Sequence, residues 1–259
     1  MTQAIDINLQ HLTLGYGHRT LLNDVSATFG AGRLTALLGR NGAGKSTLLR
    51  ALAGLEPVKG GDIVYGDRSL RQMSDGQRAR TLSFVSPQRL RVSALHVDEC
   101  VAMGRAPYTG WTGRLTGRDR QVVRQSLERV GMTDYARRTV DSLSDGERQR
   151  VMIARALAQD TPVILLDEPT SFLDLPNRHM LVRLLATLSH DDGKTIVFST
   201  HELDIAAVFA DTLAVIADCT LAVGTPDAMT AVLQQVFALP PAGPVTLSKN
   251  QFCNIPQKP

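Results

Sequence analysis

The fold of this chain is decided by the stretch Leu34-Thr35-Ala36-Leu37-Leu38-Gly39-Arg40-Asn41-Gly42-Ala43-Gly44-Lys45-Ser46-Thr47. Its first residues form a short apolar run that ends in glycine, which predicts a buried strand. A helical pattern begins at Lys45 and carries leucines at positions 48, 49, 52 and 55. Residues 39–47 match G-x-x-x-x-G-K-[ST], and a strand before and a helix after form the context that this pattern requires. The stretch therefore predicts a phosphate-binding loop.

The residue types in this loop fit phosphate chemistry. Glycines let backbone N–H groups converge on phosphate oxygens where a side chain would block the approach, and the following helix presents its positive end. Lys45 can reach the β- and γ-phosphates of a nucleotide, and Ser46 can ligate Mg²⁺. The alternative is a glycine-rich turn with a chance lysine, which the agreement of loop and flanks disfavours. The expected nucleotide-binding residues here are Gly39, Arg40, Asn41, Gly42, Ala43, Gly44, Lys45, Ser46 and Thr47.

A second motif is the apolar run Val163-Ile164-Leu165-Leu166, which two acids follow directly. Ligands of α/β proteins bind at the carboxyl ends of the strands, so these acids are candidates for chemistry. We expect Asp167 to hold Mg²⁺, directly or through water, and Glu168 to polarise an attacking water as a general base. The alternative is an acidic strand end that merely faces solvent. The neighbouring phosphate loop favours the catalytic interpretation, and the two motifs together indicate a P-loop NTPase.

Composition places the chain among ordinary globular proteins. It has 259 residues, of which 43% are hydrophobic and 20% charged, with a net charge of +3. These values exclude disorder and collagen-like repeats, and the mildly basic balance does not by itself indicate nucleic acid. A membrane-spanning helix needs about 20 mostly apolar residues, and the apolar runs here are far shorter. The start lacks the features of a secretory signal, and three widely separated cysteines indicate free thiols.

The order of patterns along the chain predicts the domain organisation. Alternating residues near the N-terminus and around 25–29 indicate antiparallel strands, and strands alternating with helices after residue 160 indicate a parallel sheet. Residues 89–142 show helical periodicity and few strand signals. We therefore predict an α/β fold: a P-loop NTPase core with a mainly parallel sheet, an N-terminal antiparallel β subdomain and a helical subdomain inserted at about 89–160. The domain is expected to span 1–237, followed by an irregular tail at 238–259.

Five further features, together with the two motifs above, resemble the ATP-binding subunit of ABC transporters, in the order typical of that family from about residue 5 to 229. Leu143-Ser144-Asp145-Gly146-Glu147 is similar to the family signature L-S-G-G-Q, and a helical pattern follows it. Gln88 resembles the Q-loop glutamine, and residues 171–174, which end in Asp174, resemble the D-loop. His201 resembles the switch histidine, and Tyr16 the aromatic residue that stacks on adenine. Each of these has an ordinary structural alternative, and their joint order is what favours the resemblance.

The signature departs from the family pattern at two positions. Asp145 replaces its first glycine, and Glu147 replaces its glutamine. The acid at 145 adds negative charge near the expected γ-phosphate, so either its side chain points away or closure driven by ATP is weakened. The segment Met73-Ser74-Asp75-Gly76-Gln77 resembles the signature almost as well. It precedes Gln88 and no apolar strand ending in Asp-Glu comes next, so we interpret it as a capped surface turn or short helix.

The resemblance implies a head-to-tail dimer that holds ATP between the phosphate loop of one copy and Ser144 and Gly146 of the other. Glu168, His201 and Gln88 would be the catalytic residues. Mg²⁺ would be held by Ser46, Gln88 and Asp167. Tyr16 and Asp174 would also contact the nucleotide. ATP binding would close the dimer, and hydrolysis with product release would reopen it.

The resemblance also implies partners and a location. The chain is expected to bind the cytoplasmic face of the inner membrane peripherally, on separate permease subunits, with an extracytoplasmic substrate-binding protein taking part indirectly. Residues 101–108 are similar to a stretch in importers of iron–siderophore, haem and cobalamin complexes. Residues 105–138 contain eight arginines but only three acids. The resulting positive charge could contact an acidic segment of the permease, lipid headgroups or only solvent. The alternatives are a soluble ABC-type ATPase acting on nucleic acid or ribosomes, and a P-loop kinase or GTPase. For the preferred hypothesis we expect no nucleic acid partner.

Overall fold

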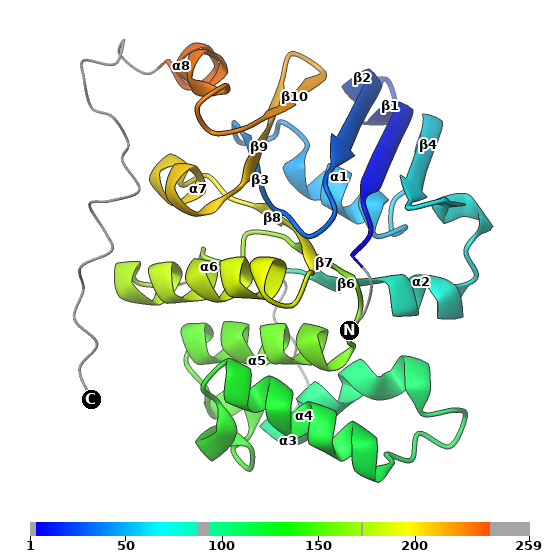
Figure 1. Cartoon of the computed structure of the whole chain (residues 1–259), viewed down its shortest axis with the longest axis vertical. Coiled ribbons are helices and arrows are strands. Elements are labelled where there is room, and N and C mark those ends of the chain that lie inside the picture. The colour runs from blue at the N-terminus through cyan, green and yellow to red at the C-terminus, as the bar shows by residue number, and fades with distance from the viewer. Residues whose placement is uncertain (1–3, 88–93, 172, 239–259) are drawn as a thin grey trace.

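The computed structural model describes residues 4–87, 94–171 and 173–238. Near the N-terminus lies a four-stranded antiparallel sheet with the strand order β2-β1-β4-β5 (Figure 1). Its strands are β1 (Ile7–Tyr16), β2 (Arg19–Phe29), β4 (Gly60–Tyr65) and β5 (Arg68–Ser69). The alternation of buried and exposed residues along β1 and β2 turns one face of this sheet toward the interior.

The second sheet has six strands in the order β10-β9-β3-β8-β7-β6. These strands are β3 (Leu34–Gly39), β6 (Leu82–Val85), β7 (Val163–Leu166), β8 (Thr195–Ser199), β9 (Thr212–Ala217) and β10 (Thr220–Gly224). All neighbours pair in parallel except β10, which runs antiparallel to β9. β3, β7 and β8 are buried along their whole length, as expected for parallel strands covered on both faces.

Helices cover both faces of this second sheet, and the sheet separates two apolar clusters. Helix α1 (Lys45–Leu52) packs between the two sheets, where Leu48, Leu49 and Leu52 are fully buried. On the other face lie α6 (Leu175–His190), α7 (Leu203–Phe209) and α8 (Thr230–Phe237), which pack against alternate residues of the same strands. Short helical segments η1 (Leu70–Gln72) and α2 (Asp75–Thr81) lead into β6.

Between β6 and β7 the chain forms the inserted helical part, which Figure 1 shows beside one edge of the molecule. Its elements are α3 (Val97–Ala102), η2 (Met103–Tyr108), α4 (Gly117–Arg129), η3 (Thr133–Tyr135), η4 (Val140–Ser142) and α5 (Asp145–Ala158). The fold class predicted from the sequence is confirmed: a parallel sheet core, an antiparallel β subdomain and helices. Among the helices of the described residues, none is both long enough and apolar enough to cross a bilayer.

The structure corrects the sequence-based predictions at two points. Helix α1 ends at Leu52, so Leu55 does not continue the helical face and is instead about half exposed. Arg105 does not belong to an arginine-rich surface, because it is buried and its Nε donates to Asp119 Oδ1 at 2.8 Å. Its guanidinium also lies 4.0 Å from the centroid of the Tyr108 ring. The Tyr108 hydroxyl donates to the carbonyl of Gln159, just after α5, and so connects η2 to that helix. The predicted tail lies mostly outside the described residues.

Candidate functional site

The phosphate loop joins β3 to α1 in the conformation that its glycines permit. Gly42 and Gly44 have φ angles of 78° and 108°, a region that residues with a side chain rarely adopt. Lys45 Nζ donates to the carbonyl oxygen of Gly39 at 2.8 Å, so the side chain folds back over the loop. Burial lowers the pKa of Lys45, while the nearby carboxylates of Glu168 and Asp167 oppose this by favouring the charged form. The hydrogen bond to Gly39 thus holds the Lys45 ammonium group over the loop.

Asp167 lies beside this loop because β7 and β3 both flank β8. Its Oδ1 accepts a hydrogen bond from Ser46 Oγ at 3.0 Å and another from Ser199 Oγ at 2.7 Å. The carboxylate, which follows β7, and the Ser46 hydroxyl, at the start of α1, thus meet at the carboxyl ends of the parallel strands. Both expected metal-binding residues that the structure describes are brought together here.

Glu168 follows in an unusual backbone conformation, with φ at 47°. Such left-handed backbone is uncommon for residues other than glycine and often marks functional sites. The hydroxyl of Ser199 accepts the backbone N–H of Glu168 at 2.8 Å, and Ser171 Oγ donates to its carbonyl at 3.0 Å. Local contacts on both sides therefore hold the backbone of Glu168, a residue that lines the cleft over the phosphate loop.

An open cleft of about 400 Å³ lies over the phosphate loop. Its walls include Tyr16, Arg19, Lys45, Ser46 and Glu168. Tyr16 is about half exposed, and its hydroxyl donates to Thr47 Oγ1 at 3.3 Å, so the residue lies beside the loop. The cleft has the size and the groups to receive a nucleotide: a ring for the base, and N–H groups and a lysine for the phosphates.

Two residues of this site were missed by the sequence analysis. Arg19 lines the cleft, and its Nη2 donates to the carbonyl of Gly42 at 3.2 Å. Ser199 joins Asp167 to the backbone of Glu168. The sequence signal for Ser199 was a polar residue at the carboxyl end of an apolar run like the one that ends before Asp167. The signal for Arg19 was a basic residue shortly after Tyr16.

The other expected site residues lie elsewhere. His201 is exposed, two residues beyond the carboxyl end of β8. Asp174 caps α6 by accepting the backbone N–H of Asn177 at 3.1 Å. Ser144 and Gly146 stand at the start of α5, on the inserted helical part and not on the walls of the cleft. Gln88 lies outside the described residues.

The start of α5 is capped by the signature segment itself. Ser144 Oγ accepts the backbone N–H of Glu147 at 3.3 Å, and Glu147 Oε2 accepts both the backbone N–H and the hydroxyl of Ser144 at 2.8 Å. These hydrogen bonds from the Ser144 N–H and hydroxyl lower the pKa of Glu147. Asp145 accepts a hydrogen bond from Arg148 at 2.7 Å. The segment at Ser74 forms the same kind of cap on α2, so the prediction of a capped short helix there is confirmed.

A lysine-bearing phosphate loop next to two acids at the edge of a parallel sheet defines a P-loop nucleoside triphosphatase. Residues 22–171, more than half of the chain, match the family model described as "ABC transporter". The chain belongs to the ABC transporter family, whose cassettes bind and hydrolyse ATP, and it is accordingly an ATP-binding ATPase.

Known proteins resemble the chain over most of its length. The iron(3+)-hydroxamate import ATP-binding protein FhuC of Bacillus subtilis is 35% identical over 240 residues, which cover 90% of this chain and 88% of that protein. A solved ABC transporter chain, described as of metal-chelate type and inward-facing, superposes with a TM-score of 0.81 at 30% identity and covers 91% of this chain and 90% of that one. A dimeric ATP-binding cassette in a post-hydrolysis state with ADP and Pi gives 0.75 at 27% identity, covering 85% of this chain and 98% of that chain.

Proposed function

We propose that this chain is the ATP-binding and hydrolysing subunit of an importer that takes up a metal chelate, such as an iron–siderophore complex, haem or cobalamin. The observation that carries the activity is the meeting of Lys45, Asp167 and Glu168 at one end of the sheet. The import direction and the cargo class are supported by relatives whose names refer to iron(3+)-hydroxamate import and to a metal-chelate transporter.

Mg²⁺ is proposed to accompany ATP at Ser46 and Asp167. Their oxygens lie 3.0 Å apart. Adjacent oxygen ligands around an octahedral Mg²⁺ are about 2.9 Å apart, since each Mg–O distance is about 2.0–2.1 Å. The spacing and the donor chemistry therefore fit the ion, which would neutralise phosphate charge when bound. Gln88 is retained as a third proposed ligand.

Glu168 is proposed to act as the general base. Its carboxylate would accept a proton from the water that attacks the γ-phosphorus, and the bond to the bridging oxygen would break with ADP as the leaving group. Lys45 would stabilise the phosphate oxygens, and His201 would hydrogen-bond the γ-phosphate and help to orient the water. Tyr16 would stack on adenine.

The site within one chain is half of the proposed complete site. Three of the expected nucleotide-binding residues do not line the cleft of their own chain: Ser144, Gly146 and Asp174. We expect them to contact the ATP that is bound to a second copy. The solved cassette, which is dimeric with ADP and Pi bound, supports the formation of a dimer. The N-terminus of α5 would then meet the γ-phosphate of that nucleotide.

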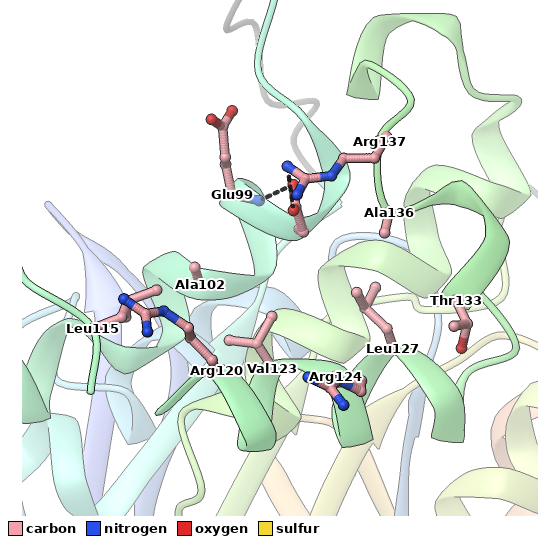
Figure 2. Close-up of a pocket in the computed structure, with 11 residues that line it drawn as sticks. Glu99, Ala102, Leu115, Arg120, Val123, Arg124, Leu127, Thr133, Ala136 and Arg137 are labelled. Carbon is pink, nitrogen blue, oxygen red and sulfur yellow. Dashed lines mark hydrogen bonds and ion pairs between the residues drawn. The ribbon is translucent and has the colours of Figure 1, made fainter. Parts of the chain in front are cut away.

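The proposed permease contact is a groove on the inserted helical part (Figure 2). It has a volume of about 450 Å³ and an apolar floor that includes Ala102, Val123 and Leu127. Arg120 and Arg124 are exposed on one side of α4 at its rim, whereas Arg137 is paired with Asp98 at 3.1 Å. The exposed Glu99 also lines the groove, and its Oε2 lies 3.3 Å from His96 Nδ1. Apolar surface beside two arginines fits a short cytoplasmic segment of the permease that carries both apolar and acidic residues.

Charge reversal tests this contact. The double substitution Arg120→Glu and Arg124→Glu is expected to abolish co-purification with the permease, while leaving ATP binding intact because α4 is remote from the cleft walls. Arg68→Glu on β5, also exposed, is the matched control. Equal recovery of the permease with the wild-type chain, the double variant and the Arg68→Glu control would show that this groove is not the docking surface.

We further propose that the chain is held peripherally at the inner membrane by the permease, that an extracytoplasmic binding protein delivers the cargo, and that nucleic acid is not a partner. The decisive experiment measures uptake of labelled iron–siderophore, haem and cobalamin in cells deleted for this chain. Uptake of one of them should be lost, restored by the wild-type chain, and not restored by Glu168→Gln. Unchanged uptake of all three, with co-purifying nucleic acid, would instead establish the soluble ABC-type ATPase.

A further inference from the structure

The acid inside the signature segment is bound by a residue of its own helix. Arg148 Nη1 donates to Asp145 Oδ1 at 2.7 Å, and Arg148 Nη2 donates to the carbonyl of Leu143 at 2.9 Å. The guanidinium group therefore lies between the residue that precedes Ser144 and the acid that follows it. The side chain of Arg148 is only 17% exposed, so it is packed in place and not swinging in solvent.

The same local structure occurs a second time in the chain. Asp75 and Arg78 occupy the same positions at the start of α2, where Arg78 Nη2 donates to Asp75 Oδ1 at 2.8 Å. Ser74 caps this helix with Gln77, as Ser144 caps α5 with Glu147. The two helices have different surroundings, so the ion pair follows from the local sequence Ser-Asp-Gly-x-Arg, which places acid and arginine one helical turn apart.

We propose that Arg148 is a positioning residue that keeps the Asp145 carboxylate on its own helix and neutralises it, so that the α5 N-terminus can accept a γ-phosphate. The inference rests on the proposed ATP-bound dimer. A carboxylate released from Arg148 would be free to turn toward the helix N-terminus, where its charge would repel the phosphate. Near a protein surface two unit charges 4 Å apart interact by about 4 kcal/mol, so repulsion of about a third of that strength weakens phosphate binding about tenfold per site.

The test compares variants in a Glu168→Gln background, in which the ATP-bound dimer should accumulate. Arg148→Gln should weaken ATP-induced dimerisation by about a hundredfold, since two sites each lose about tenfold, as measured by sedimentation. Binding of ATP to the monomer should not change, because the cleft is built by other residues. Adding Asp145→Asn should restore dimerisation, and Asp145→Asn by itself should change it less than threefold. Arg78→Gln, which breaks the equivalent pair on α2, is the matched control and should have no effect.

The outcomes separate this inference from the proposed function. A Glu168→Gln parent that stays monomeric with ATP would overturn the ATP-bound dimer, and this inference with it. A parent that dimerises while Arg148→Gln dimerises equally well would overturn only the role of Arg148. A dimerisation deficit that Asp145→Asn does not restore would do the same, because the arginine would then act through the carbonyl of Leu143 and not through the charge of Asp145. Circular dichroism of each variant identifies any that does not fold.

Discussion

Substitution of Ser199 by alanine should damage both the stability and the activity of this protein. The Ser199 side chain is fully buried at the end of β8. Its hydroxyl donates to Asp167 Oδ1 at 2.7 Å and accepts the backbone N–H of Glu168 at 2.8 Å. Alanine removes both interactions and adds none, and it leaves the N–H of Glu168 without this acceptor.

The magnitude follows from these two hydrogen bonds. A hydrogen bond to a charged group contributes about 1.5–3 kcal/mol and one between neutral groups about 1 kcal/mol, so the free energy of unfolding should fall by about 3 kcal/mol. In a chain of this size, a loss of that order lowers the midpoint of thermal unfolding by roughly 6–12 °C. Glu168, the proposed general base, would also lose the contact that fixes its left-handed backbone, and misplacement of such a group costs up to about a hundredfold in rate. We therefore expect kcat to fall about 10- to 100-fold.

Ser83→Ala provides the matched control for this substitution. Ser83 is equally buried on β6 in the same sheet, but its hydroxyl makes one long hydrogen bond of 3.5 Å to the carbonyl of Val163. Its loss should change stability by less than about 1 kcal/mol and kcat by less than about twofold. Urea unfolding of the nucleotide-free protein and steady-state ATP hydrolysis give the two measurements. Equal effects of both substitutions would show that Ser199 does not organise the acidic site.

Three further outcomes are expected. Lys45→Ala should reduce ATP affinity at least tenfold by equilibrium binding, because it removes the ammonium group held over the loop at 2.8 Å from the Gly39 carbonyl; unchanged affinity would exclude a phosphate contact. Arg19→Ala should raise the dissociation constant for ATP by about three- to tenfold, as a guanidinium at the cleft wall contributes about 1 kcal/mol, whereas the exposed Arg68→Ala should not. Asp119 has a pKa lowered to about 2, first by the Thr116 hydroxyl and then by the Thr116 N–H and Arg105. Because its folded pKa lies below the ordinary value, the stabilisation it gives is present above about pH 4 and is lost as the pH falls toward 2, so Asp119→Asn should flatten the pH dependence of urea unfolding in that range.

The sequence predicted the parts of the site that are encoded by neighbouring residues. The phosphate loop, the acids after β7 and the helix that follows the signature segment each depend on a few consecutive positions, and a strand or helix pattern is enough to place them. The cap and the acid–arginine pair occur at the start of both α5 and α2, from the same short sequence. Their cause is therefore local. For Asp145, the structure thus supports the first of the two alternatives, a carboxylate turned toward its own helix.

The sequence did not predict contacts that depend on strand register or on packing between distant segments. Ser199 reaches Asp167 because β7 and β8 pair with Leu166 opposite Phe198, a register that no short motif announces. Arg105 looked like one arginine among several, yet its partners are Asp119 and the carbonyl of Ala158, which only the packing of η2 against α4 and α5 brings near. Its burial removes it from the charged surface on which the docking hypothesis was first based.

One packed contact joins the segment that follows Glu168 to the signature segment within a chain. A Cβ atom on Gly146 would stand 2.9 Å from Leu173 Cδ2, so Leu173 packs directly on the signature glycine. Leu173 is buried and lies five residues after Glu168. In the proposed dimer, Glu168 faces the nucleotide of its own chain while Gly146 faces that of the partner. Since protein interiors are close-packed, a displacement of Leu173 would press on Gly146 in the first turn of α5.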